Sequence, residues 1–398
     1  MSAPSTPIRL RTPLVPRSPD EPHRAATPLE LLFDLVFVVA IAQAASGLHH
    51  AVAENHIGDG LVSYLLVFFG VWWAWLNFTW FASAYDSDDV AYRLIVFVQL
   101  TGALILAAGV SSAFEENSWG LPIVGYVIMR LATVVQWLRV SMADPERKPA
   151  ALRYALGITL VQIGWCLAYF VPESVFYPIF VVGAIFELAV PIWAERASPT
   201  TWHAEHIAER YGLFTIIVLG ESILASTLAI EDTTITTDFD AELAGIIIGG
   251  LLIVLSMWWF YFAQNSAELL TSLQRAFFWG YGHYFVFAAV AAVGAGIAVA
   301  VDYATDHAEI GRLTANLALT VPVAIFVLGV WLLNYRFRTT RKLEQLIAPA
   351  FALVILLTAW TDMAVLLTGL LLALDVAIKI VVHAERGDSF EVGFVGDD

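Results

Sequence analysis

The sequence predicts an all-α integral membrane protein that crosses the bilayer about twelve times, in two parallel repeats of six helices. Composition is the first reason: charged residues make up 14% of the chain and apolar residues 59%, whereas a soluble domain carries roughly 25% charged residues. The second reason is that the apolar residues arrive in blocks of about 18 to 24, the length of helix that crosses a hydrocarbon core of ~30 Å. A soluble fold of this length would need more polar surface.

Twelve apolar blocks are visible with a window of bilayer length. They cover residues 28–48, 61–82, 92–113, 121–140, 153–171, 175–194, 207–229, 243–263, 276–300, 314–335, 345–360 and 363–382. The last two form one stretch that is too long for a single span, and we expect a turn from Trp360 to Asp362 to divide it. Eleven spans is the alternative count.

A tryptophan-rich segment occurs twice, which predicts an internal duplication. Gly70 to Trp80 in the second block resembles Leu255 to Gln264 in the eighth, and each segment follows a block that carries carboxylates. The implied unit of six spans gives two repeats of the same orientation, residues 28–200 and 201–384. Chance recurrence among fourteen tryptophans is the alternative explanation.

Lysine and arginine collect in alternate loops, which predicts the orientation of the chain. On the side of the N-terminus lie Arg139, Arg147, Lys148, Arg153, Arg196, Arg275, Arg336, Arg338, Arg341, Lys342 and Arg386. Only Arg312 falls in a loop on the other side. Because cytoplasmic loops carry an excess of Lys and Arg, we expect a multi-pass protein of the inner (cytoplasmic) cell membrane with both termini in the cytoplasm.

The two ends of the chain are polar. Residues 1–27 hold six prolines and four arginines, with no separate apolar region or cleavage site before Leu29. We therefore expect a disordered cytoplasmic tail rather than a removable signal peptide. Residues 385–398 form a second, acidic tail.

Composition also excludes several classes of function. The net charge of −16 comes largely from short acidic loops and the C-terminal tail, and without a basic patch nucleic-acid binding is not predicted. The single cysteine, Cys166, excludes an internal disulfide framework and a cysteine zinc cluster, and we expect it to pack among apolar neighbours. No nucleotide-binding glycine loop or catalytic triad is present, so neither enzyme activity nor a cofactor is predicted.

Ionised residues inside the apolar blocks are the candidate functional groups, because a charge in hydrocarbon costs several kcal/mol unless it has a partner or a function. The first block carries Glu30 and Asp34 on one helical face. Capping of the helix start suffices to explain Glu30. The seventh block places Arg210 and Glu221 on one face, with Glu221 near the membrane centre, and His206, directly before the block, falls on the same face. A structural hydrogen bond between helices is the alternative for Glu221.

Arg130 in the fourth block is the one central cation in the sequence. There are three candidate anions for it: Asp34, Glu187 and Glu221. We expect its guanidinium to pair with one of them. The remaining carboxylates must bind protons or cations, or open into water. This imbalance predicts that the protein handles protons or cations.

Two further clusters have structural interpretations. Asp375 and Lys379 are separated by four residues on one helix, so we expect them to neutralise each other. His203, His206 and Glu209 could reach one zinc ion. Catalytic zinc helices usually space their histidines four apart, however, so a hydrogen-bonded cap is favoured and no metal site is predicted.

Three segments together resemble the low temperature requirement A (LtrA) family of bacterial and archaeal membrane proteins. They are Thr27 to Gln43, Phe186 to Pro191 and His203 to Ser222. The resemblance implies a role in growth in the cold and carries over no catalytic residues. More weakly, Phe33 to Phe37 resembles the Phe-Ser-Asp motif of lysosomal-type potassium channels, although the serine is absent and the second repeat has Phe214-Thr215 instead.

The sequence as a whole predicts a proton- or cation-coupled transporter of an unknown small solute, in contact with the lipid bilayer. One alternative is a cation channel with pore helices 28–48 and 207–229. Another is a non-transporting receptor, cofactor-binding or lipid-organising protein. Broken helices at matching positions favour a transporter, and a symmetric apolar constriction favours a channel. The sequence leaves the oligomeric state open, a homo-oligomer included.

Overall fold

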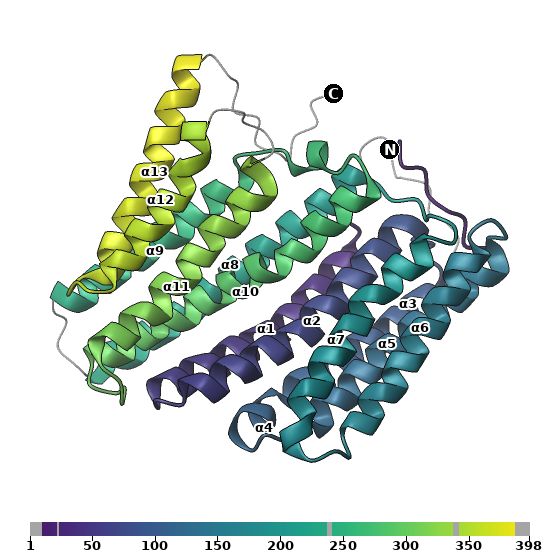
Figure 1. Ribbon diagram of the computed structural model, residues 1–398, viewed down its shortest axis with the longest axis horizontal. Coiled ribbons are helices and arrows are strands. Elements are labelled where there is room, and N and C mark those ends of the chain that lie inside the picture. The colour runs from purple at the N-terminus through teal and green to yellow at the C-terminus, as the bar shows by residue number, and fades with distance from the viewer. Residues whose placement is uncertain (1–9, 22–23, 237–240, 337–341, 387–398) are drawn as a thin grey trace, which may run out of the picture. The chain divides into compact units, whose positions relative to one another are not determined.

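The computed structural model describes residues 10–21, 24–236, 241–336 and 342–386, and every regular element within them is helical. The elements, labelled in Figure 1 where there is room, are α1 (Pro28–Ala53), α2 (Ile57–Tyr85), α3 (Val90–Ala108), α4 (Val110–Glu115), α5 (Gly120–Ala143), α6 (Lys148–Ala168), α7 (Glu173–Glu195), α8 (Ala204–Thr236), α9 (Ala241–Phe262), η1 (Ser266–Leu269), α10 (Leu273–Ala304), α11 (Arg312–Val330), η2 (Trp331–Tyr335), α12 (Lys342–Thr358) and α13 (Ala364–Arg386).

Within the described ranges, eleven helical segments are long and apolar enough to cross a membrane, and α3 and α4 together count as one of them. The apolar helix α12 is shorter. Each of the twelve predicted blocks corresponds to one of these segments. The turn predicted at 360–362 is also confirmed, because α12 ends at Thr358 and α13 begins at Ala364.

The chain forms two compact units whose boundaries differ from those of the predicted repeats. Unit 1 comprises Met1–Ala40 and Gly70–Ile207, and unit 2 comprises Ile41–Phe69 and Ala208–Asp398. Helices α1 and α2 therefore contribute one part to each unit. The six-helix duplication stays a prediction.

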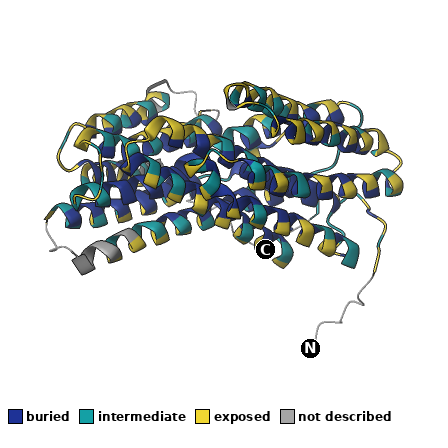
Figure 2. Cartoon of the chain, turned by 90° about the horizontal axis from the view of Figure 1, so that it is seen from below, coloured by how far each residue is buried: buried dark blue, intermediate teal, exposed yellow. Residues whose placement is uncertain are grey.

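In unit 1, α3 packs on α5, α5 on α6 and α6 on α7 (Figure 1). The contact between α3 and α5 depends on two glycines: a Cβ atom on Gly102 would lie 2.7 Å from the carbonyl oxygen of Gly125. Small residues allow this close backbone approach between membrane helices. Buried residues line the inner faces of the helices and exposed residues their outer faces (Figure 2). Cys166 lies on an outer face and is exposed, so our expectation that it packs was wrong.

In unit 2, α10 packs against α11, and α9 against α13. His283 on α10 is fully buried, with its Nδ1 atom 2.7 Å from the carbonyl oxygen of Trp279 and its Nε2 atom 3.0 Å from the hydroxyl of Tyr261. Both ring nitrogens are thereby satisfied within the protein. Lys379 lies 2.8 Å from Asp375 on α13, which confirms the predicted pair.

Candidate functional site

Glu187 on α7 and Arg130 on α5 form a buried ion pair in unit 1. The Nη2 atom of Arg130 lies 2.8 Å from Oε2 of Glu187, and neither side chain is more than 1% exposed. The structure thus selects Glu187 from the three carboxylates predicted as partners of Arg130. Four neutral side chains also donate to this carboxylate: Trp73 Nε1 (2.9 Å), Tyr126 Oη (2.8 Å), Gln162 Nε2 (2.9 Å) and Trp165 Nε1 (3.3 Å).

The five donors come from three different helices, α2, α5 and α6. A carboxylate offers about four lone-pair positions, so the hydrogen-bonding capacity of Glu187 is filled. Of the Arg130 guanidinium, Nη2 makes the bond to Glu187, whereas Nε and Nη1 are buried without a hydrogen-bond partner among the described residues. Opposite charges that are paired can be buried, whereas one of them alone is strongly unfavourable. We interpret this cluster as a fixed anchor that holds the helices of unit 1 together.

Glu30 lies in the first turn of α1 and has two roles there. Its Oε2 atom accepts hydrogen bonds from the Thr27 amide (2.8 Å) and the Thr27 hydroxyl (3.0 Å), while the Glu30 amide lies 3.3 Å from the same hydroxyl. This is the reciprocal capping box of a helix N-terminus, and it agrees with the predicted capping role. The Oε1 atom lies 3.1 Å from Nε2 of His206, and both side chains are buried.

Asp34 lies one turn further into α1 and is completely buried. Its Oδ1 atom accepts a hydrogen bond of 2.7 Å from the indole of Trp75 on α2. Phe33, the preceding residue, stacks on Phe78 of α2 with ring centroids 3.7 Å apart. Two carboxylates one helical turn apart, Glu30 and Asp34, and the imidazole of His206 are therefore buried at this end of unit 1.

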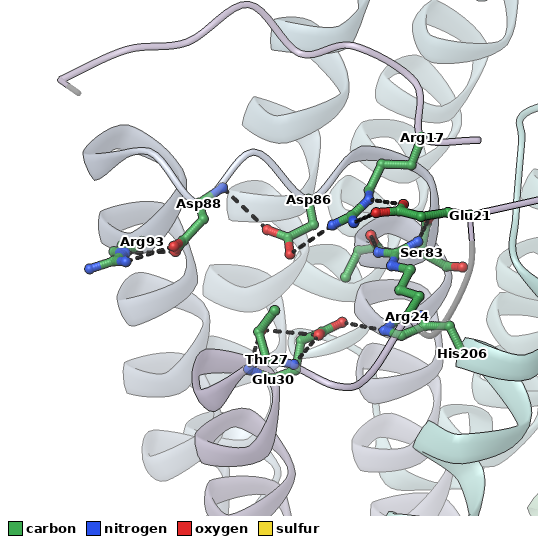
Figure 3. A network of polar contacts seen from close by, with 11 residues as sticks. Arg17, Glu21, Arg24, Thr27, Glu30, Ser83, Asp86, Asp88, Arg93 and His206 are labelled. Carbon is green, nitrogen blue, oxygen red and sulfur yellow. Dashed lines mark hydrogen bonds and ion pairs between the residues drawn. The ribbon is translucent and has the colours of Figure 1, made fainter. Parts of the chain in front are cut away.

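The chain segment before α1 crosses this end of unit 1 (Figure 3). We name residues 10–21 and 24–27 the N-terminal strap. Arg24 donates to the carbonyl oxygens of Ala82 (2.6 Å) and Ser83, at the end of α2. Further along the strap, the Arg17 amide donates to the Ala84 carbonyl oxygen (2.9 Å), and Leu14 is only 2% exposed. The strap has no regular secondary structure, but residues 10–21 and 24–27 make defined contacts that the prediction of a disordered tail did not include. Residues 1–9 and 22–23 of the predicted tail lie outside the described residues.

A charge network joins the strap to the loop between α2 and α3. Arg17 donates to Glu21 at 2.5 Å and lies 3.7 Å from Asp86 (Figure 3). Burial raises the pKa of Asp86 to about 6, the charge of Glu30 also raises it, and Arg24 and Arg17 oppose this effect. The Arg17 hydrogen bond in turn lowers the pKa of Glu21. Asp86 can therefore change its charge close to neutral pH.

Both ring nitrogens of His203, one of the two histidines considered as metal ligands, make hydrogen bonds within the protein. His203 Nε2 lies 2.7 Å from the carbonyl oxygen of Glu21 in the strap. Its Nδ1 atom accepts from the His206 amide at 3.2 Å, which fits a neutral ring protonated at Nε2. The described residues contain no group of three His, Cys, Asp or Glu side chains arranged to hold a metal ion.

The other two candidates on α8 belong to unit 2. Arg210 is completely buried, whereas Glu221 is partly exposed. His206 belongs to unit 1, whereas Arg210 and Glu221 belong to unit 2. The predicted polar stripe is therefore divided between the two units. Glu221 stays a candidate because it is a carboxylate within a helix long and apolar enough to cross a membrane.

Sequence reasoning missed the neutral partners of the buried carboxylates. Tyr126 and Arg130 lie four residues apart on α5, and Gln162 and Trp165 lie three apart on α6. These spacings place each pair on one helical face, and they were the signal available in the sequence. No comparable spacing in the sequence indicated that the indole of Trp75 would donate to Asp34.

Comparison with known proteins places the chain in a family. The family described as bacterial low temperature requirement A protein (LtrA) matches residues 25–383. The chain is also similar to "Uncharacterized protein RA0937" of Rhizobium meliloti (strain 1021), with 26% identity over 280 residues. That similarity covers 64% of this chain and 64% of the relative.

Proposed function

The chain belongs to the bacterial low temperature requirement A family, and for this member we propose proton-coupled transport of a small solute across the cell membrane. In this proposal both termini face the cytoplasm, as the distribution of Lys and Arg predicts. The link to growth at low temperature comes from the family's name and is carried over as part of the proposal.

The contact between His206 and Glu30 is the observation that supports the proposal. The imidazole and the carboxylate are 3.1 Å apart and buried, and Asp34 follows one turn deeper in the same helix. Histidine is the side chain whose ordinary pKa lies closest to physiological pH. A proton can therefore move between such groups at a small cost in free energy, which is the property that a proton-coupled carrier needs.

The Arg130–Glu187 cluster has a different role in this proposal. Its charges are matched and its carboxylate accepts five hydrogen bonds, so protonation of Glu187 would break contacts from three helices. We assign the fixed, structural role to this cluster. The exchangeable proton is assigned to Glu30, His206 and Asp34.

Purified protein in liposomes that contain a pH-sensitive dye would test this function. Candidate solutes are added outside one at a time, and a solute that is transported with protons should change the internal pH. Glu30→Gln keeps an oxygen for the Thr27 hydrogen bonds and removes the titratable group, and Asp34→Asn does the same for the Trp75 hydrogen bond. We expect each variant to lower the solute-driven pH change about ten-fold or more, the scale on which an acid–base group acts.

Asp302→Asn is the matched control, because Asp302 is a carboxylate of unit 2 that lies 2.6 Å from His49. This variant should transport normally. Equal transport by Glu30→Gln, Asp34→Asn and the unchanged protein, at equal amounts in the membrane, would contradict the proposal. A cation current that needs no solute would instead indicate a channel, and no protein-dependent flux of any tested solute or ion would indicate a non-transporting protein.

A further inference from the structure

Helices α6 and α7 form the two walls of an open groove on unit 1. Its volume is about 530 Å³, within the range of ~300–1,000 Å³ typical of ligand sites. The lining is apolar and includes Leu160 and Gly164 of α6 and Val182 and Phe186 of α7. Both helices are long and apolar enough to span a membrane, so the groove would open toward the hydrocarbon of the bilayer.

Gly164 leaves part of the groove open. No atom lies within 4 Å of the position that a Cβ atom would take on Gly164, so the space beside it is empty of protein. Trp165 lines the groove at the next position of α6, and its indole donates to Glu187. The lining residues of α7 run from Ile179 to Trp193, which at 1.5 Å per residue is ~21 Å of helix. This length suits an extended hydrocarbon chain, because one leaflet supplies roughly half of a ~30 Å core.

One end of the groove carries positive charge. Arg153 lies over the ring of Trp193, 5.2 Å from its centroid, and its Nη1 atom donates to the Trp193 carbonyl oxygen at 2.9 Å. Lys148, the first residue of α6, and Arg196, directly after α7, belong to the same end and are exposed. Two acids lie near this end: Glu195 is buried and accepts from Tyr154 and Thr200, and the exposed Glu146 pairs with Arg147 at 2.7 Å. An aromatic ring with a basic side chain is typical of the level of lipid head groups.

We infer that this groove binds an anionic glycerophospholipid, with one acyl chain along the apolar wall and the phosphate at Arg153. Basic residues beside membrane helices attract anionic head groups, and each strengthens binding about five-fold. The apolar wall would bind the acyl chain. The basic end would make the groove prefer an anionic head group to a neutral one. This inference is independent of the proposed transport.

Native mass spectrometry of the purified full chain can count bound lipids during titration with phosphatidylglycerol or with phosphatidylcholine. We expect the first phosphatidylglycerol to bind more tightly than the first phosphatidylcholine. Arg153→Gln keeps a donor for the Trp193 carbonyl oxygen and removes the charge. It should weaken the first phosphatidylglycerol about five-fold, as the loss of one basic contact implies, and leave phosphatidylcholine unchanged. Gly164→Leu fills the groove and should weaken both lipids.

Two control variants match these changes. Arg93→Gln removes an exposed arginine that pairs with Asp88 at 2.7 Å, and Gly58→Leu adds the same side chain at another glycine with open space around it. Both should bind lipid normally. The inference would be overturned if phosphatidylglycerol showed no preference, or if all four variants bound it alike.

Photo-crosslinking of the unchanged protein decides the question even if a variant fails to fold. Phosphatidylglycerol with a diazirine in its acyl chain should label peptides between residues 157 and 193, and excess unlabelled phosphatidylglycerol should compete. Labelling confined to other helices would show that the groove is not the site.

Discussion

Glu187 accepts hydrogen bonds from side chains of three helices, and only one of its donors, Arg130, carries a charge. Glu187 or Arg130 alone would be costly in a membrane interior. Together the donors satisfy a buried carboxylate, so the stability of the cluster depends on every member. A change at Arg130 should therefore have consequences out of proportion to the loss of one contact.

Arg130→Met tests this dependence. The methionine fills similar space but leaves the Glu187 charge buried without its cation, and breaking a buried ion pair in this way costs about 3–5 kcal/mol. We expect little folded protein, measured as the monodisperse fraction in size-exclusion chromatography in detergent. Arg93→Met is the control, because the exposed pair with Asp88 contributes only about 0–1 kcal/mol. Equal recovery of the two variants would refute the anchoring role.

The N-terminal strap is the element whose structure the sequence predicted least well. A polar segment rich in proline lacks the apolar area to form its own core. The strap is instead held by contacts with other elements of unit 1. Leu14 is buried, Arg24 donates to the end of α2, and the Thr12 amide donates to Asp89 at 2.7 Å. Asp89 also caps α3 through the Tyr92 amide and pairs with Arg139 of α5.

The strap should make stability depend on pH through Asp86. Its pKa is about 6 in the folded protein, against 3.8 ordinarily, so the folded state holds the proton more tightly than the unfolded state. Stability contributed by this group is present below the ordinary pKa and is lost as the pH rises through 6. The groups that act on Asp86 are Glu30, Arg24, Arg17 and Asp88.

Asp86→Asn should therefore flatten the pH dependence. Between pH 5 and 7.5 the unchanged protein should lose about 1 kcal/mol more stability than the variant. Thermal unfolding in detergent at the two pH values measures this difference. The comparison isolates Asp86 because all other groups are shared, and parallel pH profiles would show that Asp86 does not titrate in this range.

At the scale of the whole molecule, the sequence predicted the helices better than their contacts. The blocks follow from the thickness of the bilayer, which acts on each helix separately, so even the turn between α12 and α13 was predicted correctly. The pairing of Arg130 with Glu187 joins residues 57 positions apart, and charge alone indicated three candidate partners. The indole of Trp75 at Asp34 depends on how α1 packs against α2, and no periodicity encodes that contact.

The predicted orientation of the molecule in the membrane can be tested by labelling cysteines placed at the two ends of one helix, α5. Glu116 lies before α5 and Glu146 beyond its other end, and both are exposed. If Lys and Arg mark the cytoplasmic side, Glu116 faces outward and Glu146 inward. In a Cys166→Ala background, a membrane-impermeant maleimide should label Glu116→Cys in intact cells and Glu146→Cys only after permeabilisation. The reverse pattern would invert the topology, and it would also move the strap, the His206–Glu30 contact and the basic end of the α6/α7 groove to the outer side of the membrane.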